Sequence, residues 1–213
     1  MTYVLIPGAG GAAWYWHRVL PLLDNAVAVD LPADDESAGL DAYVDLVVDA
    51  ANGATDVVLV AQSMGAFTAL PACARLPVSR LVLLNAMIPA PGETAGDWWE
   101  NTGSAEARIA AAREGGYPQG FDLDTYFLHD VDPEVFASGE AHQRNEADIA
   151  FEQPCEFSEL PPTTVIAGRD DRFFPFDFQR RVARERLGVD VVGVPGGHLA
   201  ALSHPEAVAQ AIG

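Results

Sequence analysis

Apolar residues along this chain gather into short, continuous runs of four to six positions. Runs of this length, rich in Val, Leu, Ile and Ala, are typical of strands buried on both faces of a parallel sheet. The pattern predicts strands over residues 3–6, 26–31, 56–61, 80–84, 164–167 and 189–194.

The stretches between several of these runs are amphipathic. From Leu40 to Ala51 the apolar residues recur at helical spacing, and Asn52-Gly53 follows as a stop signal. The same reasoning predicts helices over residues 14–23 and 65–76. Strands that alternate with helices indicate an α/β fold with a mostly parallel sheet flanked by helices on both faces.

Residues 89–161, which we term the cap, interrupt this alternation. They contain helical patterns over 105–113, 133–138 and 141–151, and they are rich in aromatic residues. A segment of this size between two core strands is interpreted as an insertion, so residues 1–213 form one domain with a helical cap.

Composition narrows the possible partners. The 213 residues, 49% of them hydrophobic, suffice for one sizeable core. The formal net charge is −19, and all twelve basic residues are arginine. This excess of acidic residues argues against nucleic acid and anionic membranes as partners. It is explained more simply as a means of keeping the protein soluble, or as an adaptation to a host with high salt.

The chain also lacks signals for export or membrane insertion. Its first residues, MTYVLIPGAGG, have no basic leader, and the longest apolar runs are too short to span a bilayer. Cys73 and Cys155 lie far apart without metal-ligand spacing. We expect a cytoplasmic protein with two free thiols.

The stretch VVLVAQSMGAF carries the first candidate for chemistry. Ser63 lies where the predicted strand over residues 56–61 gives way to a helix, and the residues two before and two after it are Ala61 and Gly65. Small residues there permit the sharp turn that exposes a nucleophilic serine, in the pattern A-x-S-x-G in place of G-x-S-x-G. An ordinary helix-capping serine is the alternative.

A serine nucleophile that attacks a carbonyl needs two N–H donors for the developing oxyanion. The backbone of Met64, directly after the serine, is one candidate. The second is the N–H of Ala9 in the glycine-rich loop Pro7–Gly11. A nucleotide-binding loop is the competing interpretation, although the loop matches G-x-G-x-x-G only loosely.

The nucleophile also needs a base and a carboxylate that orients it. Of five histidines, His198 follows the last predicted strand, where sites of open α/β sheets assemble. Asp171 follows the strand before it and is preferred over its neighbour Asp170. The order serine, aspartate, histidine is the order that α/β-hydrolases use.

Four segments, VLIPGAGGAAWYWHRV, VVLVAQSMGAF, TTVIAGRDDRFFP and VPGGHLAALSHPE, together resemble the α/β-hydrolase fold family. Within it the chain is most similar to the small serine esterases that group with plant methyl-ester esterases and hydroxynitrile lyases. The loop of those esterases usually begins His-Gly, whereas here it begins Pro7-Gly8. The lyases use a lysine near the base, and the absence of lysine here disfavours that reaction.

The resemblance implies hydrolysis of a small, largely apolar carboxylic ester without metal or organic cofactor. Trp98, Trp99, Phe127 and Phe173 are candidates for the substrate pocket, although packing of the cap onto the core also explains such aromatic residues. Thioester or C–C bond hydrolysis with the same triad, and ligand binding by a receptor-like protein, stay open. The sequence determines neither the acyl and alcohol groups of the substrate nor the oligomeric state.

Overall fold

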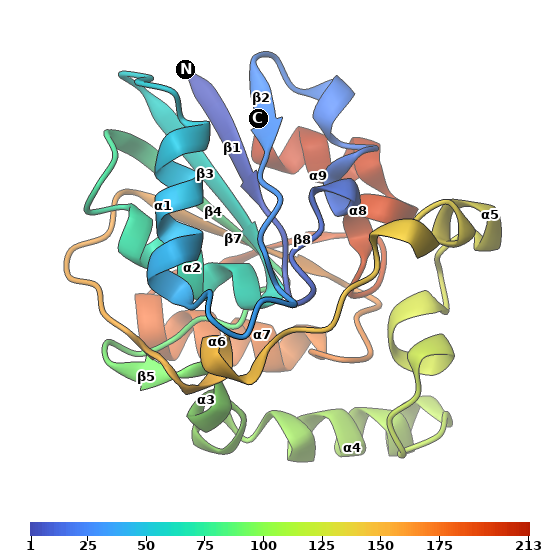
Figure 1. The fold of residues 1–213 in the computed structure, drawn as a ribbon. Helices are drawn as coiled ribbons and strands as arrows, with labels where there is room; N and C mark the ends of the chain where they lie inside the picture. The colour runs from blue at the N-terminus through green and yellow to red at the C-terminus, as the bar shows by residue number, and fades with distance from the viewer.

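The computed structural model describes residues 1–213 and is built around a six-stranded sheet in which every neighbouring pair is parallel (Figure 1). The strands are β1 (Thr2–Ile6), β2 (Ala26–Ala28), β3 (Val57–Gln62), β4 (Val78–Leu84), β7 (Thr163–Gly168) and β8 (Val191–Val194). Their order across the sheet is β2-β1-β3-β4-β7-β8. All six predicted strands and the α/β fold class are confirmed, although β2 ends at Ala28 and not at Leu31.

Alternate residues of each strand face two separate hydrophobic clusters. In β3, Leu59 lies in the larger cluster and Val58 in the smaller one, on opposite faces of the sheet. Side chains of a strand point alternately to its two faces. A continuous apolar run therefore places the strand between two dry layers, as the sequence predicted.

Helices form those layers (Figure 1). The larger cluster includes residues of α1 (Leu40–Ala50), α2 (Ala66–Ala72) and α7 (Phe176–Leu187). The smaller cluster includes residues of α8 (Ala200–Ser203) and α9 (Pro205–Ile212) and of a 3-10 helix at Ala13–Trp16. No helix of the chain combines the length and the apolar character that crossing a membrane requires.

The helix predicted over residues 14–23 is wrong. Two separate 3-10 helices, Ala13–Trp16 and Leu20–Leu22, occupy this stretch. Pro21 has no N–H to donate, and its ring crowds the preceding helical turn, so it disfavours a continuous α-helix through this stretch. The helix predicted over 65–76 begins instead as a 3-10 turn at Ser63–Gly65, and α2 ends at Ala72.

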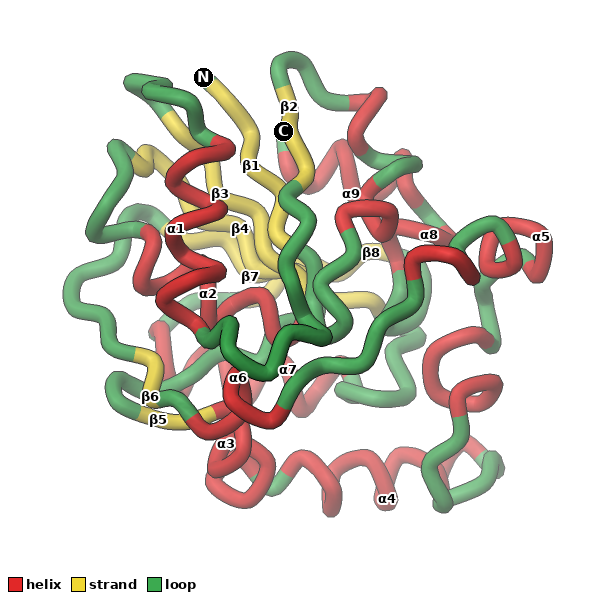
Figure 2. The backbone as a smooth tube through the Cα atoms, viewed as in Figure 1, coloured by secondary structure: helices red, strands yellow, loops and turns green.

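The cap contains short helices joined by extended chain (Figure 2). Its elements are β5 (Glu93–Thr94), α3 (Ala95–Thr102), α4 (Ser104–Gly115), a π-helical turn at Asp124–Leu128, α5 (Pro133–Ala137), a 3-10 turn at Glu140–His142, α6 (Asp148–Glu152) and β6 (Pro154–Cys155). The continuous helix predicted over 141–151 is therefore wrong. In its place, residues between His142 and α6 run extended along the loop that follows β1, and the Ala147 N–H donates to the Ala33 carbonyl.

Two contacts fasten the start of the cap to the rest of the molecule. Strands β5 and β6 pair antiparallel, which joins the two ends of the cap. The buried carboxylate of Glu93 forms an ion pair with Arg186 of α7, through both guanidinium Nη atoms. Burial favours the neutral form of Glu93, but its hydrogen bonds from Arg186, Ala90 and Asn101 outweigh burial and lower its pKa.

Candidate active site

The candidate nucleophile lies on a sharp turn at the carboxyl end of β3. Ser63 has a φ of +50°, in the left-handed region that residues with a Cβ rarely adopt. A Cβ at Gly65 would collide with the backbone carbonyl of Pro7. The small residue at this position therefore lets the helix start pass close to the loop after β1.

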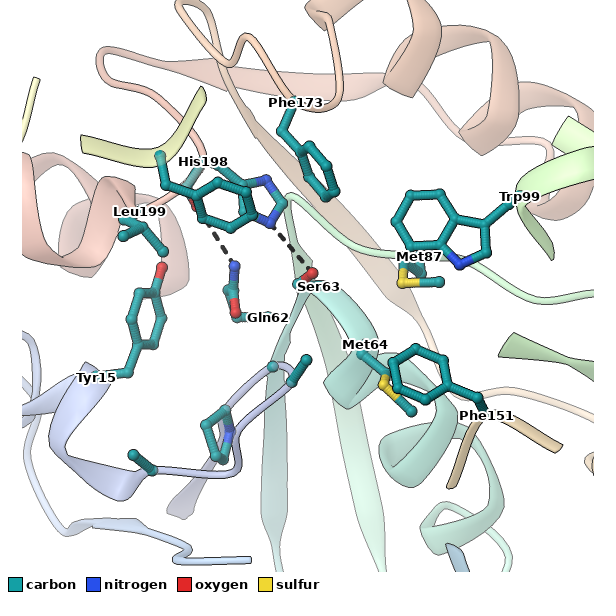
Figure 3. A pocket seen from close by; sticks show the side chains of 15 residues that line it. Tyr15, Gln62, Ser63, Met64, Met87, Trp99, Phe151, Phe173, His198 and Leu199 are labelled. Atoms are coloured by element: carbon teal, nitrogen blue, oxygen red, sulfur yellow. Dashed lines mark hydrogen bonds between the residues drawn. The ribbon is translucent and has the colours of Figure 1, made fainter. Parts of the chain in front are cut away.

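The imidazole of His198 lies between the serine and an aspartate. Its Nε2 is 3.2 Å from the Ser63 Oγ, and its Nδ1 is 2.9 Å from the Asp171 Oδ2 (Figure 3 shows the serine contact). All three residues are buried. Since β3, β7 and β8 are parallel, their carboxyl ends meet at one edge of the sheet and bring the three loops together.

The Asp171 carboxylate is held by four hydrogen bonds. Its Oδ1 accepts from the N–H groups of Phe173 and Phe174, both at 2.9 Å, and its Oδ2 accepts from the Gln179 Nε2 at 3.1 Å and from His198. These bonds fix the orientation of the carboxylate toward the imidazole. Asp170 instead points to the backbone of Gly196, whose N–H is 3.3 Å from its Oδ2.

Two supporting residues escaped the sequence analysis. Asn85, fully buried directly after β4, donates from Nδ2 to the carbonyls of Gly197 and His198, both at 3.0 Å, and its Oδ1 accepts from the Gly168 N–H at 2.7 Å. It therefore ties the loop of the base to the end of β7. A polar residue at the end of the run RLVLL is a signal that could have found it, whereas Gln179, inside α7, gives no such signal.

The loop that follows β1 also lies beside the serine. Both candidate oxyanion donors, Ala9 and Met64, line the cavity that contains the Ser63 hydroxyl. Next to Ala9, the Gly10 N–H donates to the Glu146 Oε2 at 2.7 Å, and the Tyr43 hydroxyl donates to the other oxygen of Glu146, also at 2.7 Å. Burial raises the pKa of Glu146, although both hydrogen bonds act in the opposite direction.

The same segment of the cap makes a further contact with this loop. The Arg144 Nη2 donates to the Gly11 carbonyl at 3.3 Å and to Asp30 at 2.8 Å. Asp30, two residues after β2, also accepts from the Ala13 N–H. The cap therefore contributes two charged side chains to the conformation of the loop after β1.

The cavity around Ser63 measures about 210 Å³ and is largely apolar. Its walls include three of the four pocket candidates, Trp99, Phe127 and Phe173, and in addition Met87, Phe151 and Leu199 (Figure 3 labels all of these except Phe127). Trp98 does not line it. That indole is fully buried against Phe174 and Phe178, and its Nε1 donates to the Ile88 carbonyl.

The remaining histidines lie away from the serine. His17 is exposed in the 3-10 region, His129 and His142 belong to the cap, and His204 precedes α9. No three His, Cys, Asp or Glu side chains are grouped to hold a metal ion. Cys73 and Cys155 are both free, and burial raises the pKa of each thiol to about 12.

A family model described as the alpha/beta hydrolase family matches residues 3–211, almost the whole chain. The chain belongs to this family. No curated protein sequence matches it significantly. Its fold is nevertheless shared by many solved structures, among them an esterase, a methylesterase and a pyrethroid hydrolase.

Three of these structures illustrate the similarity. A pyrethroid hydrolase from Sphingobium faniae is 23% identical, with 100% of this chain and 95% of that chain covered and a TM-score of 0.79. Polyneuridine aldehyde esterase is 20% identical, with 99% and 97% covered and a TM-score of 0.77. A methylesterase from Arabidopsis is 17% identical, with 99% and 96% covered and a TM-score of 0.75. At these identities the likeness establishes the fold of this hydrolase and not its substrate.

Proposed function

We propose that this hydrolase cleaves a small, largely apolar carboxylic ester through an acyl-enzyme formed on Ser63. The observation that carries the proposal is the unbroken hydrogen-bond chain from Asp171 through His198 to Ser63 beside an apolar cavity. A serine hydroxyl becomes a useful nucleophile when a positioned base accepts its proton, and an oriented carboxylate stabilises the resulting imidazolium.

The reaction proceeds in two steps. His198 Nε2 accepts the Ser63 proton while the Oγ attacks the ester carbonyl, and the N–H groups of Ala9 and Met64 stabilise the oxyanion. His198 then donates that proton to the leaving alcohol. A water attacks the acyl-enzyme in the same way, the carboxylic acid departs and Ser63 regains its proton. Asp171 stays ionised throughout.

The comparisons support ester chemistry in general terms. The structures of similar fold are named as an esterase, a methylesterase and a pyrethroid hydrolase. The aromatic and aliphatic walls of the cavity favour an uncharged substrate, and its volume favours a small one.

The test is a panel of p-nitrophenyl esters of graded acyl length, run beside the variants Ser63→Ala and His198→Ala. We expect each variant to lower kcat by a factor on the order of 10³ or more, because each removes a member of one catalytic unit. A fluorophosphonate probe should label the wild-type protein at Ser63 alone. Undiminished hydrolysis by Ser63→Ala, or no labelling of the folded protein, would contradict the proposal.

Thioesters and β-diketones of matched size extend the same panel. If one of these classes is hydrolysed with a much larger kcat/KM than any ester, the triad assignment stands and the bond specificity changes. If no compound is hydrolysed but one shifts the melting temperature, the protein binds the ligand without turning it over.

A further inference from the structure

A second cavity, which we term the outer cavity, adjoins the one around Ser63 and lies beside the cap helix α4. It measures about 270 Å³, and the side chains of Trp99 and Phe173 line both cavities. The centroids of these two rings are 5.6 Å apart. Figure 3 shows both rings on the side of Ser63 away from Tyr15 and Leu199. An arm of a bound ester that passes these rings therefore reaches the outer cavity.

The outer cavity combines an apolar wall with one cationic side chain. Its wall is formed by Trp99, Phe121 and Phe173. Phe121 is 53% exposed, which is unusual for a large apolar side chain and typical of a surface that contacts a ligand. Two polar side chains, Ser104 and Arg108, also line the cavity, and the Ser104 hydroxyl donates to the Trp99 carbonyl at 3.4 Å. Arg108 is therefore the polar group that is left for a ligand.

The guanidinium of Arg108 is held in position and still has free N–H groups. Its Cζ lies 4.9 Å from the centroid of the fully buried Tyr126 ring, and its Nη1 donates to the Gln119 carbonyl at 3.0 Å. Its Nε and Nη2 make no hydrogen bond within the protein, and neither atom is buried. The N–H groups of Nε and Nη2 lie on one edge of the planar guanidinium and match the two oxygens of a carboxylate.

Arg108 also lacks an acidic partner, although acidic residues are in large excess. The chain has 31 acidic residues against 12 arginines, and six of the arginines form ion pairs with Asp or Glu. Arg108 is not among these six, so a carboxylate of a ligand meets no competing carboxylate there. The net charge of −19 repels a dianion such as a phosphate monoester more strongly than a monoanion. A carboxylate is therefore the anion that this site favours.

We propose that Arg108 determines substrate specificity by binding a carboxylate at the far end of the ester arm that passes Trp99 and Phe173. The preferred substrates are then esters with an apolar arm that ends in a carboxylate, such as half-esters of dicarboxylic acids. The part of the substrate around Ser63 is uncharged, and the charge lies in the outer cavity. This inference rests on the proposed ester hydrolysis and refines it to a chemical class.

The test uses matched ester pairs in which one arm ends either in a carboxylate or in the isosteric primary amide. One series carries this group on the acyl arm and another on the alcohol arm, each at graded chain length. The ratio of kcat/KM, carboxylate over amide, is measured by pH-stat in the wild type, Arg108→Gln and Arg108→Lys. Comparing the proteins cancels the intrinsic reactivity of each ester. Arg113→Gln is the matched control, because Arg113 lies on the same helix, outside both cavities, and donates to the Gln119 side chain.

We expect the ratio to fall about tenfold in Arg108→Gln for one arm at its best chain length, because a charge-assisted contact is lost at a site that water partly screens. Arg108→Lys keeps the charge without the paired N–H groups, so its ratio should be intermediate. The ratio should stay unchanged in Arg113→Gln.

A ratio in Arg108→Gln that equals the wild-type ratio for every pair overturns the inference while ester hydrolysis stands. This holds also if both members of each pair become slower, since a merely structural role of Arg108 lowers both alike. An equal fall in Arg113→Gln overturns it too, because it would show a general effect of charge on α4. Failure to hydrolyse any ester, with no labelling of Ser63, overturns both proposals.

Discussion

At the scale of single residues, the site is defined by which aspartate faces the imidazole. Asp171 and Asp170 are neighbours at the end of β7, yet only Asp171 contacts His198, because the N–H groups of Phe173 and Phe174 turn its carboxylate inward. Asp170 bonds to the backbone of the adjacent loop. One carboxylate faces the imidazole, and the other joins its loop to the neighbouring loop.

This difference predicts unequal effects of the same substitution. Asp171→Asn should lower kcat by a factor on the order of 10³–10⁴, because the amide no longer stabilises the imidazolium or selects the tautomer. Asp170→Asn should change kcat by less than about threefold. Steady-state kinetics on one p-nitrophenyl ester measures both. The reverse ranking would move the orienting carboxylate to residue 170.

Sequence reasoning could locate the residues whose place in the chain reveals their role. Ser63, Asp171 and His198 each follow a strand made mostly of apolar residues, and parallel strands bring their carboxyl ends to one edge of the sheet. Gln179 and Glu146 could not be found this way, because each lies in a different element from the group that it holds. Their roles depend on tertiary contact, which no local pattern encodes.

At the scale of elements, the cap and the loop after β1 depend on each other. The loop turns through Gly10 at a φ of +84°, and its N–H is held by Glu146 of the cap. Since Gly10 follows Ala9 directly, the bond restrains the direction of the neighbouring N–H. We therefore expect a carboxylate that does not line the cavity around Ser63 to act on the proposed oxyanion donor.

Removing that restraint should impair turnover more than binding. Glu146→Ala should lower kcat about 10- to 100-fold with little change in KM, which is less than the loss of an entire oxyanion donor. Glu146→Gln retains an acceptor oxygen and should stay within about threefold of the wild type. Because burial raises the pKa of Glu146, the wild type and both variants are compared at one alkaline pH, which favours the ionised carboxylate.

A trifluoromethyl ketone separates this role from a loss of folding. Its tetrahedral adduct carries an oxyanion, so its Ki should rise in Glu146→Ala in parallel with the fall in kcat. A rise in KM alone, or unaltered kcat, would show that Glu146 serves only to pack the cap.

The elements that were predicted wrongly have physical explanations. Residues 14–23 carry a helical pattern, but Pro21 divides them. Residues 141–151 also carry one, but there the Ala147 N–H donates to the Ala33 carbonyl, and the side chains of Arg144 and Glu146 bond to the loop after β1. Periodicity reports which side chains are buried, and it cannot report that a backbone has found partners elsewhere.

At the scale of the whole molecule, net charge is the dominant electrostatic feature. The carboxylates behind a formal charge of −19 on 213 residues repel one another, and the four Arg–Asp and Arg–Glu pairs in which both members are exposed offset little of this repulsion. Salt screens such repulsion over distances longer than about 10 Å at 0.1 M.

The melting temperature should therefore rise with salt, by about 2–5 °C between roughly 0.02 M and 0.5 M NaCl at pH 8. Differential scanning fluorimetry at matched protein concentration measures the shift. At pH 5 part of the carboxylates are protonated, and the rise should be smaller. A melting temperature that falls with salt would show that attractive ion pairs outweigh the repulsion.

The contact between Glu146 and Gly10 also bears on how enzymes of this architecture can be re-engineered. Replacing all of residues 89–161 with the cap of a relative, to change selectivity, would remove the Glu146 contact beside the proposed oxyanion donor together with the cavity residues of the cap. Chimeras that keep residues 144–147 should retain the kcat of this protein. Chimeras that exchange them should fold but have a lower kcat. Substrate selectivity can therefore be changed without loss of kcat only if residues 144–147 are kept.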